Sequence, residues 1–204
     1  MASIQCERKE KVAVQLSCEQ KATLDELIKC AEKSLVSEDI AKKSRAIVAE
    51  KECLNKADAD AARLSAVAGA LTNQTSKGSL TVFNSKQWKG YTVSDYSDPL
   101  ESLGSFAQAA LFGGVKAAVV YVGKNSAGLE CGWLLAWSDT DGRKAYADCG
   151  PISKFNNINW NQIEAKLNES GFIAYANDSG TGTSMYATIV GHSAGSAVAV
   201  AYTG

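Results

Sequence analysis

The sequence predicts an α+β protein in which an N-terminal helical region packs on a C-terminal antiparallel β-sandwich. In the first third of the chain, apolar side chains recur at helical spacing, and no glycine precedes Gly69. After the polar segment Asn73–Gly78, short apolar runs alternate with clusters of Gly, Asn, Asp and Ser, a pattern typical of strands and turns. We therefore expect a helical region at residues 1–74 and a β-sandwich domain at residues 75–204.

Two helices are expected after residues 1–17, which we interpret as a frayed or docking segment. The first covers Ala22–Leu35, whose apolar residues share one helical face. The second begins after Ser37, because a serine followed by two acidic residues is a favourable helix start. We expect it to reach about Leu71 as a long helix packed on a neighbour, with an independent coiled coil as the alternative. The expectation rests on a seven-residue repeat of Ile40, Ile47, Leu54, Ala61 and Ala68.

Three consecutive strands form the centre of the predicted sandwich, at Lys116–Val122, Leu129–Ser138 and Arg143–Asp148. Turn-forming segments separate them. Both faces of the middle strand are apolar, which predicts a strand buried on both sides with Trp133 and Trp137 in the core. A disulfide between Cys131 and Cys149 is an alternative to two buried free thiols.

The flanking segments predict further strands and one short helix. The helix, Asn159–Leu167, carries its apolar residues on one face. Ser105–Phe112 fits either a helix or a strand, because it is alanine-rich but flanked by glycines. Trp88–Ser94 is expected to be a strand or an irregular edge. The remaining strands are expected at Ser79–Asn84, Phe172–Ala176, Met185–Val190 and Ala197–Tyr202.

Composition narrows the functional classes. The net charge of −1 gives no support for a nucleic-acid partner, whose phosphates require a basic surface. The N-terminus shows no secretory signal, and no apolar run is long enough for a transmembrane helix, so a cytoplasmic protein is expected. The six cysteines lie far apart and His192 is the only histidine, so we expect no metal site and no cofactor.

Residues 191–195, Gly-His-Ser-Ala-Gly, match the G-x-S-x-G nucleophile motif of hydrolases. That mechanism needs a histidine base after the serine, and no His, Asp or Glu follows Ser193. We therefore expect a Gly-Ser turn between strands. Asp139–Gly142 is likewise expected to be a turn, because Trp137 stands where a calcium loop requires a carboxylate. No catalytic residues are assigned, and the protein is expected not to be an enzyme.

Three aromatic residues in a polar stretch are the candidate ligand-binding residues. Trp88, Tyr91 and Tyr96 could stack on a sugar or lie at a lipid interface. The alternative is that Trp88 and Tyr91 pack on the sheet. Both interpretations remain open at this point.

The central strands also carry a family resemblance. Its residues are Ala118–Tyr121, Gly123, Asn125, Gly128, Cys131, Trp133 and Leu135–Ser138, followed by Trp160, Ile163, Leu167 and Ser170-Gly171. With a weaker similarity at Arg45–Phe83, this pattern resembles the small jasmonate-induced proteins of plants over about two thirds of the chain. The chain departs from that family at Gly132, where an acidic residue usually precedes the tryptophan.

The resemblance implies a plant protein induced by jasmonate or stress, and it transfers no catalytic residues. The strand order around one short helix is also similar to actinoporin-like and aegerolysin-like sandwiches. We expect a non-enzymatic stress or defence protein that binds a carbohydrate or another small ligand, as a lectin does. The alternatives are a membrane-active, pore-forming-like protein, suggested by the alanine-rich segment Phe106–Val122, and a storage or structural protein. A lipid ligand and a homo-oligomer are also left open.

Overall fold

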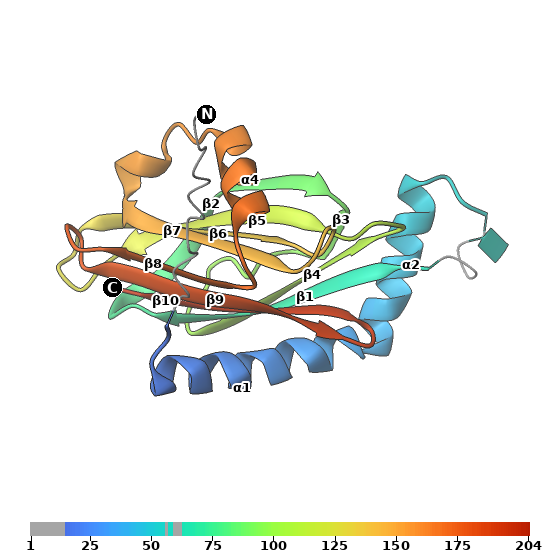
Figure 1. Cartoon of the computed structure of the whole chain (residues 1–204), viewed down its shortest axis with the longest axis horizontal. Coiled ribbons are helices and arrows are strands. Elements are labelled where there is room, and N and C mark those ends of the chain that lie inside the picture. Colours follow the sequence, from blue (N-terminus) through green and yellow to red (C-terminus); the bar gives the residue numbers. More distant parts are fainter. Residues whose placement is uncertain (1–14, 56, 59–62) are drawn as a thin grey trace, which may run out of the picture.

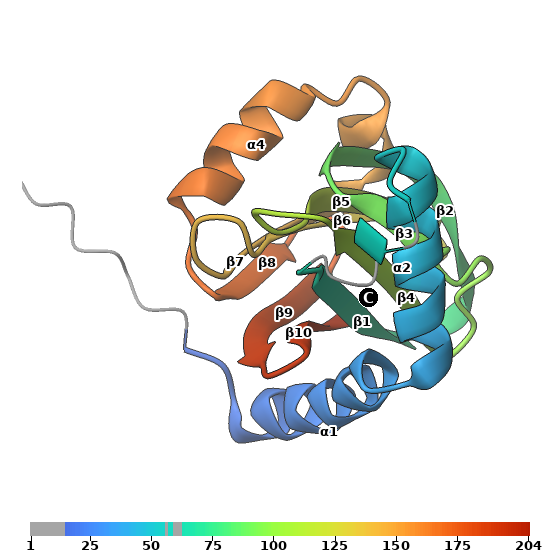
Figure 2. The ribbon, with the colours of Figure 1, turned by 90° about the vertical axis from the view of Figure 1, so that its right-hand side faces the viewer.

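The computed structural model describes residues 15–55, 57–58 and 63–204. Two β-sheets pack face to face, and a helix covers the outer face of each (Figures 1 and 2). The predicted α+β class and sandwich architecture are confirmed. The helices are α1 (Cys18–Leu35), α2 (Glu38–Lys51), the short 3₁₀ helix η1 (Ile152–Phe155) and α4 (Trp160–Glu169).

The first sheet has six strands in the order β3-β4-β1-β10-β9-β8. Neighbouring strands are antiparallel except for β1 and β10, which run parallel in the centre of the sheet. The strands are β1 (Ser65–Gln74), β3 (Tyr91–Ser94), β4 (Leu103–Ala110), β8 (Ile173–Asp178), β9 (Thr183–His192) and β10 (Gly195–Thr203).

The second sheet has four antiparallel strands in the order β2-β5-β6-β7. They are β2 (Lys77–Lys89), β5 (Lys116–Lys124), β6 (Glu130–Ser138) and β7 (Lys144–Pro151). The strand expected at Trp88–Ser94 is divided, because the chain crosses from this sheet to the other at Gly90, whose φ of +88° favours glycine. Trp88 therefore ends β2, and Tyr91 begins β3.

The interior between the sheets contains one face of β6, whose Trp133 and Trp137 are fully buried. The opposite face of β6, with Leu134 and Ala136, is also buried, but beneath α4 and η1. The predicted strand buried on both sides is thus confirmed. Cys131 and Cys149 are buried thiols without a disulfide.

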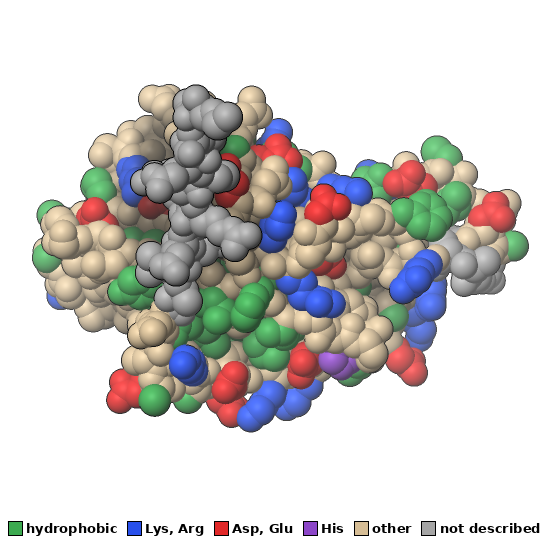
Figure 3. Space-filling view, in the orientation of Figure 1, with side chains coloured by type: hydrophobic (Ala, Val, Ile, Leu, Met, Phe, Trp, Pro, Cys, Tyr) green, Lys and Arg blue, Asp and Glu red, His purple; other side chains and the backbone are tan. Residues whose placement is uncertain are grey.

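Helix α1 packs on the outer face of the six-stranded sheet. Ser17 and Gln20 form a capping box at its start, in which each side chain pairs with the other residue's backbone N–H. The sheet presents mainly alanines to the helix, which lets the leucines of α1 approach closely. Apolar side chains gather where α1 meets the sheet, whereas acidic and basic side chains are interspersed elsewhere on this face (Figure 3).

The prediction of one long helix to Leu71 is wrong. Helix α2 ends at Lys51, and Ser65–Gln74 forms β1 in the centre of the larger sheet. The chain therefore changes from helix to strand before β1, not at Asn73–Gly78. Part of the expected helix (residues 56 and 59–62) and most of the N-terminal segment (residues 1–14) lie outside the described residues.

The remaining predicted elements are found close to their expected positions. Ser105–Phe112 contributes most of β4, so the strand interpretation holds there. Asn159–Leu167 becomes α4, with Asn159 accepting a hydrogen bond from the Gln162 N–H. The Gly-His-Ser-Ala-Gly motif forms the tight connection between β9 and β10, as expected.

Candidate functional site

The main hollows of the described residues gather at one end of the sandwich, which faces the viewer in Figure 2. This end holds α2, the β2–β3 crossing and the connections between β4 and β5, β6 and β7, and β9 and β10. The C-terminus lies at the opposite end (Figure 1). Because loops positioned by a rigid sheet commonly carry binding residues, this end is the candidate binding region.

One of these hollows, of about 400 Å³, is bordered by aromatic side chains. We call it the aromatic hollow and define it by Glu52, Gln87, Trp88, Lys89, Tyr91 and Phe112. Two of the three aromatic residues predicted from the sequence therefore line the same hollow. The crossing at Gly90 brings them together, because the end of β2 is followed directly by the start of β3.

Trp88 forms one wall and is half-buried. Its ring meets the ring of Trp160, the first residue of α4, edge to face at a centroid distance of 6.0 Å. Trp88 therefore packs against the cluster beneath α4 and also lines the aromatic hollow. The sheet-packing interpretation holds for this residue, and its role in ligand binding stays a prediction.

Tyr91 is held by the end of α2. Its hydroxyl donates a hydrogen bond of 2.7 Å to Glu52 Oε1, and Glu52 is the residue that caps α2. This hydrogen bond to a carboxylate, together with some burial, raises the pKa of Tyr91. Helix α2 thus orients the ring and brings a carboxylate to the rim of the hollow.

Phe112 is the most exposed aromatic side chain at the hollow, with 68% of its surface accessible. It lies in the β4–β5 connection and is followed by Gly113 and Gly114, both with positive φ. A side chain at Gly113 would overlap the ammonium group of Lys89, so the glycine lets this cation approach the loop. The sequence prediction missed Phe112 and Glu52. The Phe-Gly-Gly pattern is a local signal for an aromatic residue at a turn, whereas Glu52 has no such signal.

Tyr96 lies apart from the aromatic hollow. Its ring packs on Phe106 and Trp137 at centroid distances of 5.2 and 6.1 Å, and its hydroxyl accepts a hydrogen bond from Gln108 Nε2. Burial raises the pKa of Tyr96 well above its usual range. Gln108 also donates to Gln87, so Tyr96 contacts the wall of the hollow only through an intervening side chain.

The aromatic hollow combines two kinds of contact. The rings of Trp88, Tyr91 and Phe112 offer apolar faces, while Glu52 and Gln87 offer hydrogen-bond acceptors and donors. Such a mixture of aromatic surface with a few polar groups is typical of small-molecule sites. We find no arrangement of nucleophile and base in this hollow.

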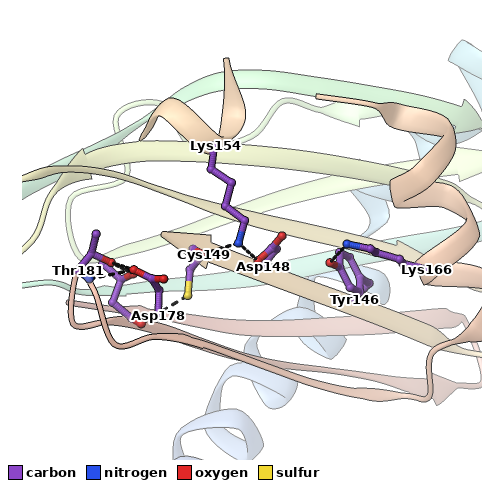
Figure 4. A network of polar contacts seen from close by, with 8 residues as sticks. Tyr146, Asp148, Cys149, Lys154, Lys166, Asp178 and Thr181 are labelled. Atoms are coloured by element: carbon purple, nitrogen blue, oxygen red, sulfur yellow. Dashed lines mark hydrogen bonds and ion pairs between the residues drawn. The ribbon is translucent and has the colours of Figure 1, made fainter. Parts of the chain in front are cut away.

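A second polar region lies on the outer side of β7 (Figure 4). Lys154 extends from η1 to Asp148, with an Nζ–Oδ1 distance of 2.6 Å, and also donates to the Cys149 carbonyl. Lys166 of α4 donates to the Tyr146 hydroxyl at 3.2 Å. These cations already have partners on β7, so the network attaches η1 and α4 to the sheet.

The structure gives no hydrolytic arrangement at the Gly-His-Ser-Ala-Gly motif. His192 Nδ1 accepts a hydrogen bond from the Ala194 N–H at 3.1 Å, so this nitrogen is directed at the backbone rather than at the Ser193 hydroxyl. Within the described residues, no group of three or more His, Cys, Asp or Glu side chains is placed to hold a metal ion. None of the described helices has the length and apolar character needed to cross a membrane.

Comparison with known proteins shows similarity to a curated relative by sequence and to several solved structures, and no family model matches the chain. The Jasmonate-induced protein homolog of Atriplex canescens is 38% identical over 108 residues. The match covers 48% of this chain and 58% of that protein, so the chain spans little more than half of its relative's length.

Among solved structures, the lipid-binding protein Nakanori aligns with a TM-score of 0.56 at 13% identity, covering 98% of this chain and 94% of that one. The Xerocomus chrysenteron lectin XCL aligns with a TM-score of 0.44 at 10% identity, covering 69% of this chain and 100% of that one. The predicted resemblance is therefore confirmed: the chain is similar to a jasmonate-induced protein over about half of its length, and its fold is that of Nakanori.

Proposed function

We propose that this protein is a non-enzymatic, ligand-binding protein of the plant stress response, and that its aromatic hollow binds a carbohydrate. The observation that carries the proposal is the convergence of Trp88, Tyr91 and Phe112 on one hollow that also contains Glu52 and Gln87. The relative named for its induction by jasmonate supports the stress role. That the protein is cytoplasmic and that it forms a homo-oligomer remain predictions.

The chemistry of the aromatic hollow suits a sugar. A pyranose ring has an apolar C–H face that packs on an aromatic ring, and hydroxyl groups that need donors and acceptors. Trp88 and Phe112 supply the rings, while the Glu52 carboxylate and the Gln87 amide supply the polar partners. The Tyr91–Glu52 hydrogen bond holds both groups in place, which reduces the entropy lost on binding.

A glycan array followed by calorimetry of the best ligand tests this proposal. We expect Trp88→Ala to weaken binding by about tenfold or more, which corresponds to about 1.4 kcal/mol. Because Trp88 also packs on Trp160, its loss could disturb α4. Phe112→Ser is the second variant, since this side chain is mostly exposed and its loss leaves the core intact.

Phe172→Ser is the matched control, because Phe172 is 57% exposed and lies outside the aromatic hollow. Binding should be unchanged in this control. The carbohydrate proposal fails if the array gives no ligand, or if Trp88→Ala and Phe112→Ser bind as tightly as the wild type. Absence of any ligand would favour the storage or structural alternative.

The second candidate function is binding to a membrane surface through the same end of the molecule. Phe112 projects from the β4–β5 connection beside Lys89, so an apolar ring and a cation lie together as a lipid interface requires. A protein with the same fold is named as lipid-binding, which adds support. Most of Phe106–Val122, by contrast, is buried in β4 and β5, so its insertion into a bilayer would require both sheets to open.

Vesicle co-flotation separates this candidate from the first. Neutral, anionic and sphingolipid-containing vesicles would be compared for the wild type and Phe112→Ser, with dye leakage recorded in the same samples. Binding that depends on Phe112 without leakage supports surface attachment, and leakage supports the pore-forming alternative. If the protein floats with no vesicle, the membrane candidate is rejected.

A further inference from the structure

The largest hollow at the same end of the sandwich has a different chemistry. It has a volume of about 590 Å³ and lies between the start of β1, the β6–β7 connection and the β9–β10 connection. We call it the cationic hollow and define it by Arg63, Asp139, Arg143, His192, Ser193 and Ser196. None of these residues lines the aromatic hollow.

The guanidinium group of Arg143 is held in position by backbone and side-chain contacts. It lies across Gly191, where any side chain would overlap it. Its Nε donates to Ser196 Oγ at 3.4 Å, and Ser196 is buried at the start of β10. A guanidinium has five N–H groups, so most of its donors remain for a ligand. Among the described residues, no carboxylate lies within 4.0 Å of Arg143 or Arg63.

The β9–β10 connection adds further donors. Because His192 Nδ1 accepts the Ala194 N–H, the neutral imidazole carries its proton on Nε2 and can donate from there. Ser193 places a hydroxyl group on the same wall, whereas the buried Ser196 hydroxyl already contacts Arg143 and Asp139. The motif that resembled a hydrolase nucleophile thus supplies donors to a hollow bordered by two arginines.

Among the described residues, Asp139 is the one carboxylate that lines this hollow. Its Oδ1 accepts the Val115 N–H and its charge also attracts the Arg143 guanidinium, so one negative charge faces two guanidinium groups. Lys154 of η1 and Asp148 of β7 are the opposite case, since there each charge has a partner at 2.6 Å. Two arginines that form no ion pair with a described carboxylate favour an anion, and the planar guanidinium matches the geometry of an oxyanion.

We propose that the cationic hollow binds an oxyanion group, phosphate, sulfate or carboxylate, of a small ligand. Arg143 binds the anion through two parallel N–H donors, and Arg63, His192 and the Ser193 hydroxyl complete the site. This site is independent of the proposed carbohydrate function, because the two hollows share no side chain.

Titration of the full chain with sodium phosphate and with sodium sulfate tests the proposal, with sodium chloride at equal ionic strength as the reference. The readout is the backbone amide signals of residues 192–196 in two-dimensional NMR. We expect saturable shifts with phosphate or sulfate and none with chloride. Arg143→Gln should weaken binding by about tenfold or more, and Arg143→Lys should bind with intermediate affinity.

Lys77→Gln is the charge-matched control, since this exposed lysine begins β2 at the far end of the sandwich. It should bind phosphate as the wild type does. Trp88→Ala should also retain phosphate binding, so failure of the carbohydrate proposal would not affect this one.

Vesicles containing phosphatidic acid distinguish a lipid headgroup from free phosphate. If attachment of the protein to these vesicles requires Arg143 but not Phe112, the ligand is the lipid headgroup. The proposal is overturned if neither anion gives a saturable shift, or if Arg143→Gln binds like the wild type.

Discussion

Asp139 joins two connections at the end of the sandwich. Its carboxylate accepts the Val115 N–H at 2.5 Å and lies beside Arg143 and Ser196. Burial raises the pKa of Asp139, although these donors and the nearby guanidinium partly oppose the shift. The sequence predicted only a turn here, because a turn-forming Asp-Thr-Asp-Gly segment does not show which backbone groups the carboxylate will bind.

Asp139→Asn should make stability less dependent on pH. A carboxyl group whose pKa is raised on folding binds more protons in the native state, so its contribution to stability is lost as pH rises through that pKa. Asparagine cannot titrate, but it retains an oxygen for the Val115 N–H. We therefore expect the wild type to lose stability relative to Asp139→Asn as the pH rises from about 3.5 towards neutrality.

Urea unfolding of both proteins across this range, in phosphate-free buffer, measures the difference. Other carboxyl groups titrate equally in the two proteins, so the subtraction isolates Asp139. A difference that is constant with pH, or that grows in favour of the wild type as pH rises, would contradict the assignment of a raised pKa.

The second sheet shows how one glycine sets the position of an element. Gly132 lies on the outer face of β6, where Phe155 of η1 covers it. A Cβ atom at Gly132 would lie 2.5 Å from Phe155 Cδ2, so the ring could not keep its position. Any larger side chain at residue 132 would need the space that Phe155 occupies.

Gly132→Ala is expected to destabilise the protein by about 1–3 kcal/mol, because added volume in a packed region forces its neighbours to move. Phe155→Ala alone should cost about 3–5 kcal/mol through the cavity that it leaves. In the double variant the alanine methyl group partly fills this cavity, so the total loss should be smaller than the sum. Chemical unfolding of the four proteins gives the coupling. Strictly additive losses would show that the two positions do not touch.

At the scale of the whole molecule, the helical region and the sandwich are joined through the core. Strand β1 pairs with β4 on one side and β10 on the other, so residues before the expected boundary at 74 form the centre of the larger sheet. Gly69 of β1 also makes room for the Phe106 ring of β4. Helix α1 then covers β1 and β10 together.

A fragment consisting of residues 75–204 is therefore expected not to reach the native fold. It lacks β1, which lies between β4 and β10. The backbone N–H and C=O groups with which β4 and β10 pair with β1 would therefore be unpaired. A fragment of residues 63–204 retains β1 and is the control, although it loses the cover of α1. Near-ultraviolet circular dichroism of the tryptophans, of which Trp133 and Trp137 are fully buried, reports native packing. A native spectrum and a cooperative transition for the shorter fragment would show that 75–204 is a domain by itself.

Local sequence patterns were enough to predict the central strands, helices α1 and α4, and two aromatic residues of the candidate site. Local patterns are sufficient there, because alternation, capping residues and turn-forming clusters act over a few positions.

The tertiary structure was needed to find β1 and the two other residues of the aromatic hollow, Glu52 and Phe112. A strand buried on both faces has a continuous apolar run, and the alanine-rich run Ala66–Leu71 is equally compatible with a helix until its partners β4 and β10 are known. Glu52 and Phe112 join Trp88 and Tyr91 for the same reason: they are distant in the chain and meet only when α2, the β2–β3 crossing and the β4–β5 connection assemble at one end of the sandwich.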